Sequence, residues 1–337
     1  MTIWKIRRDA TPTATTVLAA GEPGYDTALQ LMKIGDGVTA WSVLPYFKMT
    51  SQRGIVGGGY TGSATNAISF IEIPTKSNAE DFGDLSVTRY ALSACSSDTR
   101  GVFCAGTTGT RVNTIDYITI ASAGNATDFG DTNNAISYPA ACSSLTRGLI
   151  LGGLAAADSI NVIDYIAIAS PSNATDFGDL TSKRMGSGSC ASPTRGILAG
   201  GSDVNTIEYV TIATTGNSSD FGDLTIGDNT YLSGCSSQLI GVFGGGDYSS
   251  YTNVMSYITI AVTGNSVDFG DLTVARYGPA ACASQTYGVF SGGYSTGYHN
   301  IIDYVTFNSL TNAVDFGDLL AETSSLAACS NCHGGLL

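Results

Sequence analysis

The chain has 337 residues, of which 43% are hydrophobic and 13% are charged, so it can bury a large core. A formal net charge of −13 excludes a general basic surface for nucleic-acid phosphates, and no apolar run approaches the roughly 20 residues that span a bilayer. The 42 glycines and 17 tyrosines favour an all-β chain with many turns.

Residues 1–47 do not repeat and form the first expected domain. The opening "MTIWKIRRDA" lacks the apolar core of a secretory signal, which predicts synthesis in a cytoplasm. Three motifs follow in order: "GEPGY" at residues 21–25, "KIGDG" at residues 33–37, and Trp41 with "LPY" at residues 44–46. Two short apolar stretches around these turns predict a hairpin-like unit that is too small to be stable without neighbours.

This segment resembles the N-terminal module of bacteriophage tail-fibre and receptor-binding proteins, including the tropism-determinant type. The resemblance implies a threefold β-prism that joins a receptor-binding part to the virion, and therefore a homotrimer that contacts other virion structural proteins. The residues expected in the trimerisation module are Tyr25, Leu31, Ile34, Trp41, Leu44 and Tyr46. The alternative is that residues 1–47 pack against the rest of the same chain.

Residues 48–337 are dominated by a repeat of 44 to 48 residues. One landmark is "DFGD", another is an apolar run such as "RGLILGG", and the third is a cysteine. A single "DFG" would suggest the magnesium-binding motif of a kinase, but six copies without the other kinase motifs exclude this interpretation. The "DFGD" copies begin at Asp81, Asp128, Asp176, Asp220, Asp268 and Asp315, and the cysteines are Cys95, Cys142, Cys190, Cys235, Cys282 and Cys329.

Each unit reads as four short strands separated by turn residues, as in "GPAACAS", "YGVFSGG", "NIIDYVTF" and "AVDFGDL". Units of this length with four strands predict a β-propeller. Residues 53–333 resemble kelch repeats, although the fourth strand carries phenylalanine where kelch units usually have tryptophan. The repeat begins at a second strand and ends after a first strand, so we expect residues 326–330 to complete the first blade and close a ring of six.

The repeated residues have plain structural roles. Gly-Gly lets backbones turn or approach closely, the phenylalanine supplies burial between blades, and the aspartates suit turn capping through backbone N–H groups. Calcium held by paired carboxylates is the alternative, although the loop lacks the ligand spacing of an EF-hand. "CSNCH" at residues 329–333 matches a haem attachment motif, but the repeat already accounts for Cys329. We expect buried cysteines and no cofactor or metal.

The loops divide the propeller into two faces. Loops after the first and third strands are nearly identical between units and form what we call the uniform face. Loops after the second and fourth strands differ in length and residue type, and we call their side the variable face. Diversified loops on a rigid scaffold predict a binding surface, unless they reflect drift without a ligand. The candidate receptor-binding residues are Tyr60, Arg111, Asn113, Tyr231, Tyr248, Tyr251, Tyr294, Tyr298 and His299.

Catalysis is not expected, because two histidines and sixfold repeated carboxylates provide no distinct catalytic set. The sequence therefore predicts a phage virion protein, a tail-fibre or receptor-binding component that adsorbs to a host cell-surface glycan or protein. It would be made in the host cytoplasm and lie on the tail or capsid surface. The alternatives are a purely structural capsid-decoration or baseplate protein and a polysaccharide-degrading enzyme.

Overall fold

The computed structural model divides the chain into two compact units, Met1–Ser51 and Gln52–Leu337. The residues whose structure is described are 20, 23–26, 31–35, 37–40, 46–47, 51–156, 158–227, 229–247 and 249–336.

The described part of the N-terminal unit is an antiparallel sheet of β1 (Pro23–Asp26), β2 (Leu31–Ile34) and β3 (Tyr46–Phe47). β1 pairs with β2, and β2 pairs with β3, as expected for a hairpin-like unit, but Pro23, Gly24 and Tyr25 of "GEPGY" lie on β1 and not in a turn between paired strands. Four residues predicted for trimerisation lie on these strands, although their side chains are not described: Tyr25, Leu31, Ile34 and Tyr46. The other two, Trp41 and Leu44, lie outside the described residues.

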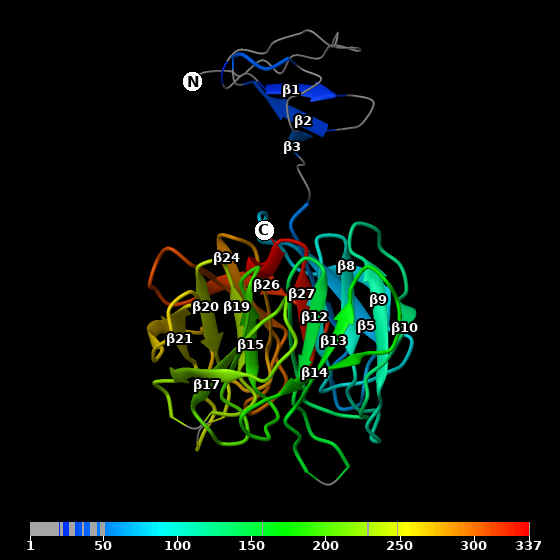
Figure 1. Cartoon of the computed structure of the whole chain (residues 1–337), viewed down its shortest axis with the longest axis vertical. Helices are drawn as coiled ribbons and strands as arrows, with labels where there is room; N and C mark the ends of the chain where they lie inside the picture. The colour runs from blue at the N-terminus through cyan, green and yellow to red at the C-terminus, as the bar shows by residue number, and fades with distance from the viewer. Residues whose placement is uncertain are drawn as a thin grey trace. The chain divides into compact units, whose positions relative to one another are not determined.

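Residues 51–336 contain six four-stranded antiparallel sheets arranged as the blades of a propeller (Figure 1). The prediction of an all-β, six-bladed fold is therefore confirmed. Blade 1 contains β27 (Ala327–Ser330), β4 (Arg53–Gly57), β5 (Ala67–Glu72) and β6 (Glu80–Asp84). Blade 2 contains β7 (Ser93–Ser96), β8 (Arg100–Cys104), β9 (Thr114–Thr119) and β10 (Thr127–Asp131). Blade 3 contains β11 (Ala140–Ser143), β12 (Arg147–Leu151), β13 (Val162–Ala167) and β14 (Thr175–Asp179).

The remaining blades repeat this order of strands. Blade 4 contains β15 (Gly188–Ala191), β16 (Arg195–Ala199), β17 (Thr206–Thr211) and β18 (Ser219–Asp223). Blade 5 contains β19 (Ser233–Ser236), β20 (Ile240–Gly244), β21 (Val254–Thr259) and β22 (Val267–Asp271). Blade 6 contains β23 (Ala280–Ala283), β24 (Tyr287–Ser291), β25 (Ile301–Thr306) and β26 (Val314–Asp318).

Blade 1 is built from both ends of the propeller sequence. β27 pairs with β4, with Ala327 opposite Gly57 and Ser330 opposite Gly54. Pairing of the last strand with the first fixes the ring by backbone hydrogen bonds and leaves no inner strand unpaired. Because the chain enters blade 1 at the start of its second strand, Gln52 lies at the uniform face.

The cysteines of the repeat fill the space between adjacent blades. The thiol of each first-strand cysteine faces the glycine at the second position of the second strand of the next blade, as Cys190 faces Gly241. A Cβ atom placed on five of these six glycines would lie 2.5 to 2.9 Å from the facing sulfur, closer than real contacts allow, and at Gly101 the distance would be a tight 3.1 Å. All eight cysteines are free, and burial raises the pKa of Cys235 to about 12. These thiols therefore act as small packing groups.

An aromatic pair holds the two outer strands of each blade together. The third strand contributes a tyrosine, or Phe70 in blade 1, and the fourth strand contributes the phenylalanine of "DFGD". In blade 3, for example, the ring centroids of Tyr165 and Phe177 are 6.1 Å apart at 74°. This edge-to-face geometry is favourable for aromatic rings, and the buried phenylalanine also packs in the core between blades.

The glycine of "DFGD" marks the contact with the next blade. A Cβ atom on Gly83 would lie 2.6 Å from the carbonyl oxygen of Gly124, and its φ of +145° also favours glycine. The side chain of Asn125 accepts a hydrogen bond of 3.1 Å from the backbone N–H of Asp84. The repeated aspartates lie on the outer strands and are exposed or half-exposed, so the asparagine, and not the expected aspartate, caps this junction.

The first strands surround a narrow channel that residues 331–336 close at the uniform face. Three cavities of about 50, 90 and 80 Å³ follow the first strands. The closing segment includes the 3-10 helix η1 (Gly334–Leu336). Nε2 of His333 lies 3.4 Å from Ser143 Oγ and 3.3 Å from the carbonyl oxygen of Ser96, while Gln285 Nε2 donates to the His333 carbonyl at 3.0 Å. The sequence had suggested no role for this segment.

The environment of His333 predicts a loss of stability in acid. Burial lowers the pKa of His333 to about 4, below its ordinary value of 6.5. The unfolded chain therefore takes up this proton first, so the stabilisation is complete above about pH 6.5 and is lost as the pH falls towards 4. We expect a loss of up to about 3 kcal/mol from this residue, since one pKa unit corresponds to about 1.4 kcal/mol. Between pH 7 and 4, the unfolding temperature of His333→Gln should depend less on pH than that of the wild type. An equal pH dependence of the unfolding temperature in the two proteins would show that His333 is not the group responsible.

Candidate functional site

The loops after the second strands form short hairpins in five blades. The stem residue Tyr294 pairs with Tyr298 across its hairpin and with Tyr277 in the loop that precedes blade 6. Two backbone hydrogen bonds of 2.9 and 3.0 Å join Tyr277 and Tyr294. The hairpin stems are therefore fixed on both sides, and they hold their side chains on a rigid base at the variable face.

Six backbone hydrogen bonds form a closed ring around the channel at the variable face. In each loop after a fourth strand, one N–H group donates to the corresponding carbonyl of the neighbouring loop at 2.6 to 3.0 Å. All six residues have φ values between +53° and +65°, although four of them are not glycine. The ring joins these loops into one frame and consists of Ala91, Tyr138, Gly186, Tyr231, Gly278 and Ser325.

Tyrosine side chains gather on this frame in a continuous series that we call the tyrosine belt. Neighbouring rings have centroids 4.9 to 6.2 Å apart, within the range of aromatic pairing. Tyr251 is 38% exposed, and the others are half-buried. The belt consists of Tyr90, Tyr60, Tyr298, Tyr294, Tyr251, Tyr277, Tyr231 and Tyr138.

The belt includes five of the predicted binding residues and three that were missed. The predicted members are Tyr60, Tyr231, Tyr251, Tyr294 and Tyr298. Tyr248 lies outside the described residues. The missed members are Tyr90, Tyr138 and Tyr277, all in loops after fourth strands. Their signal in the sequence is the aromatic residue in "TRYA", "ISYP" and "ARYG", within the loops that differ between units.

Three predicted residues lie outside the belt. Arg111 is half-buried on a hairpin stem opposite Thr107, and its Nε atom has no hydrogen-bond partner among the described residues. Asn113 is exposed, and its backbone carbonyl accepts a hydrogen bond from Thr132 N–H at 2.8 Å. The same position holds asparagine in all six units, so Asn113 is not one of the diversified residues.

His299 lies beside the belt with its imidazole engaged. Its Nε2 atom is 2.7 Å from Ser295 Oγ within the same hairpin. Burial, assisted by the positive charge of Arg276, lowers the pKa of His299, whereas Glu322 opposes this shift. His299 is therefore neutral at pH 7 and offers a polar group without a charge.

Two belt tyrosines, Tyr138 and Tyr231, are held in the neutral form by their surroundings. Burial raises the pKa of Tyr138 to about 12. Burial also raises the pKa of Tyr231, and the carboxylates of Asp203 and Asp247 raise it further. Phenol groups that remain protonated present both an aromatic face and an O–H group, a combination suited to sugars and to protein surfaces.

Three buried ion pairs anchor the loops beneath the variable face. Arg89 contacts Asp116 at 2.9 Å and Arg276 contacts Asp303 at 2.9 Å; Arg184 contacts Glu208 in the same way. Each arginine lies in a loop after a fourth strand, and each acid lies on the third strand of the following blade. The pairs occur in blades 2, 4 and 6, so alternate blades share this device, which sequence comparison of single units had not revealed.

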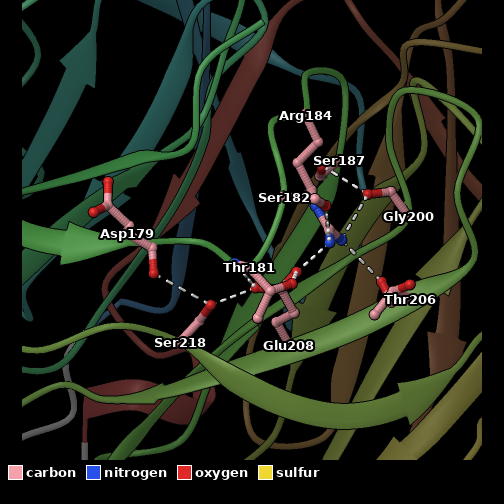
Figure 2. Close-up of polar contacts among 9 residues, drawn as sticks. All are labelled: Asp179, Thr181, Ser182, Arg184, Ser187, Gly200, Thr206, Glu208 and Ser218. Atoms are coloured by element: carbon pink, nitrogen blue, oxygen red, sulfur yellow. Dashed lines mark hydrogen bonds and ion pairs between the residues drawn. The ribbon is translucent and has the colours of Figure 1, made fainter.

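Figure 2 shows the pair in blade 4 and its hydrogen-bond partners. Arg184 donates to the carbonyl of Thr206 at 3.1 Å and to Ser182 Oγ at 3.0 Å, while Glu208 accepts from Thr181 N–H at 3.0 Å. Burial lowers the pKa of Arg184, and the charge of Glu208 opposes this shift. Moving the loop would break these hydrogen bonds and leave a buried charge without its partner. The pair therefore fixes the geometry of the loop.

No protein-family model and no curated protein matches this chain. Within residues 51–336 and the other described positions, no three His, Cys, Asp or Glu side chains are grouped so that they could hold a metal ion. Among the helices of the described residues, none has the length and hydrophobicity to cross a membrane.

The uniform face differs in chemistry from the variable face. Four large apolar side chains in its loops are 44% to 71% exposed: Leu145, Leu239, Val262 and Leu310. A cavity of about 390 Å³ lies there, lined by residues that include Leu145, Pro193 and Leu336. The propeller thus has a tyrosine-rich face with diversified loops and an opposite face with repeated loops and exposed leucine and valine side chains.

Proposed function

We propose that this chain is a bacteriophage virion protein, a tail-fibre or receptor-binding component, whose variable face adsorbs to a glycan or protein on the host cell surface. The observation that carries the proposal is the tyrosine belt, because eight neighbouring aromatic side chains lie on hairpin stems and loops that backbone hydrogen bonds fix. Rigid tyrosines contribute contact area at a low entropic cost. The kelch-like character of the repeats, inferred from their strand motifs, is part of this proposal.

The N-terminal unit supports the virion assignment through its three ordered motifs, "GEPGY", "KIGDG" and the tryptophan with "LPY". We assign it a role in trimerisation and attachment to other virion proteins. Three copies would present three variable faces, so weak contacts with a cell surface would combine into strong adsorption. In this proposal the protein is not an enzyme, and adsorption needs no cofactor.

Adsorption of the purified full chain to bacterial cells tests the receptor-binding role. We expect Tyr251→Ala with Tyr298→Ala to reduce cell-bound protein at least tenfold, because each lost aromatic contact contributes about 1 kcal/mol or more and the loss is repeated in each copy. The matched control is Leu239→Ala with Val262→Ala on the uniform face. Equal adsorption by wild type and the tyrosine variant would contradict this role for the belt.

The mass in solution tests trimerisation. Light scattering is expected to give a trimer for the full chain and a monomer for a fragment that starts at Met49, because the fragment lacks the small unit that needs neighbours for its stability. A full chain that stays monomeric at micromolar concentration would rule out self-trimerisation. Attachment to the virion would then depend on another protein.

The exposed apolar side chains of the uniform face favour a second candidate function, a structural capsid-decoration or baseplate protein that docks through this face. Leu239, which is 71% exposed, is the clearest example. Apolar groups at this exposure are common in interfaces with a protein partner. In this case, incorporation into virions would fail after Leu239→Asp with Val262→Asp, whereas the tyrosine variant would assemble and infect normally.

A further inference from the structure

The connection after the second strand of blade 4 is shorter than its counterparts and has an unusual backbone. It spans residues 200–205, whereas the corresponding connection in blade 2 spans residues 105–113. Ser202 and Asp203 have φ values of +47° and +58°, in the left-handed region that non-glycine residues rarely adopt. Non-glycine residues in this conformation are concentrated at functional sites. In this loop, the left-handed backbone at Ser202 and Asp203 determines where the Asp203 side chain lies.

Asp203 is held against the loop that leads into blade 5. Its N–H donates to Thr230 Oγ1 at 3.0 Å, and the Thr230 hydroxyl donates to Asp203 Oδ1 at 3.0 Å. On the other side, Asp247 N–H donates to the carbonyl of Thr230 at 2.8 Å. The carboxylate of Asp203 and the backbone of Asp247 therefore contact Thr230, next in sequence to the belt residue Tyr231, and the charges of both carboxylates contribute to the raised pKa of that phenol.

The described residues provide no basic partner for either carboxylate. The basic side chains of this region are engaged elsewhere: Lys183 contacts Asp158 at 2.8 Å, and the buried Arg276 contacts Asp303. Asp203 is exposed and Asp247 is half-buried, so both can be reached from the solvent. This sector of the variable face carries a local negative charge that the protein leaves uncompensated.

Aromatic rings of the belt continue from Tyr231 in this sector. The centroid of Tyr277 is 5.6 Å from that of Tyr231 and 5.4 Å from that of Tyr251, and Tyr251 is also paired through its backbone with Asp247. The faces of aromatic rings are negative and attract ammonium groups within about 6 Å. Carboxylates and aromatic faces thus favour the same sign of charge in a ligand.

We propose that this sector, formed by Asp203, Asp247, Tyr231, Tyr251 and Tyr277, binds an ammonium group carried by a cell-surface glycan. The inference rests on the receptor-binding role proposed above and names the chemistry of the ligand. Tyrosine rings suit sugar rings, the carboxylates accept hydrogen bonds from hydroxyl groups, and their charge selects a protonated amine over an N-acetyl group. The ammonium group can belong to a de-N-acetylated amino sugar or to a choline substituent.

Calorimetric titration of the full chain with a glucosamine tetramer and with its N-acetylated counterpart tests the inference. We expect the tetramer with free amines to bind at least about tenfold more tightly. Asp203→Asn with Asp247→Asn should weaken its binding about tenfold, since both charges are removed while the shapes are kept. The matched control, Asp176→Asn with Asp220→Asn, removes the same charge from the outer strands of blades 3 and 4 and should leave binding unchanged.

Competition identifies the source of the ammonium group. Displacement of the tetramer by phosphocholine would assign the site to choline-bearing glycans, and its failure would favour an amino sugar. Equal binding of the two tetramers, no binding of either, unchanged binding by the double asparagine variant, or tighter binding of an oligolysine peptide would each overturn the inference. Cell adsorption separates this result from the proposed function: adsorption that needs Tyr251 and Tyr298 but is unaffected by the asparagine variant rejects only the ammonium site.

Discussion

Replacing Asp116 by alanine is expected to destabilise the propeller by about 3–5 kcal/mol, because the substitution leaves a buried arginine without its counter-charge. Both side chains of the Arg89–Asp116 pair are completely buried, with 2.9 Å between Nη2 and Oδ2. Burial lowers the pKa of Arg89, and the charge of Asp116 opposes this shift. Calorimetry should show a fall in the unfolding midpoint of about 6 °C or more for a domain of this size.

The neutral blades of the same chain supply the matched rescue. Blade 5 has Asn229 where blade 2 has Arg89, and Ser256 where blade 2 has Asp116. Asn229 is buried and donates to the carbonyl of Gly245 at 2.9 Å. We therefore expect Arg89→Asn with Asp116→Ser to recover most of the loss caused by Asp116→Ala, since no charge remains buried.

An exposed ion pair provides the second comparison. The Lys183 and Asp158 side chains are 60% and 66% exposed, so Asp158→Ala should cost less than about 1 kcal/mol. The structure indicates that the buried pair fixes the loop after blade 1. This would be contradicted if Asp116→Ala lowered the free energy of unfolding by no more than Asp158→Ala does. The readout is stability, so this test is independent of any ligand.

These pairs also show what comparison of single repeat units could not predict. The period of the landmarks was enough to predict six blades, because every unit contains the same four strands. The ion pairs occur only in alternate blades, and each joins a loop to the third strand of the next blade. A signal was present in "TRY", "KRM" and "ARY", each followed by an acid in "IDY" or "IEY", but only a comparison of pairs of units would have revealed it.

The candidate site was also predictable only where its signal lies within a single repeat unit. Hairpin tyrosines such as Tyr294 were recognised because the loops after second strands differ visibly in length and composition. Tyr138 and Tyr231 meet across the channel mouth, with centroids 4.9 Å apart, although they are 93 positions apart in the sequence. That contact depends on the closed ring of loops, and the closing hydrogen bonds involve backbone groups that leave no pattern in the sequence. The turn-capping role expected for the "DFGD" aspartates was wrong. The backbone N–H of Asp84 is capped by the side chain of Asn125, which belongs to the next blade and so lies outside the motif.

The contact between blades leads to a second large effect, a loss of about 2–3 kcal/mol on replacing Gly241 by alanine. The new Cβ atom would lie 2.5 Å from the sulfur of Cys190 in the preceding blade, whereas the next atom, of Ile258, is 3.3 Å away. The backbone of Gly241 is not in the left-handed region, so the cost is steric and not conformational. Equilibrium unfolding in denaturant measures the loss.

The same geometry predicts a rescue. Cys190→Ala removes the sulfur, so the double variant Gly241→Ala with Cys190→Ala should be more stable than the sum of the single losses predicts, by at least about 1 kcal/mol. Gly297→Ala is the matched control, because the added Cβ atom would meet nothing within 4 Å. Simple additivity of the two single substitutions would mean that Cys190 does not limit the space at Gly241. A measured coupling would instead identify the cysteine–glycine contact as the reason that both residues recur in each unit: the thiol fills a gap that only the absence of a side chain on the neighbouring blade provides.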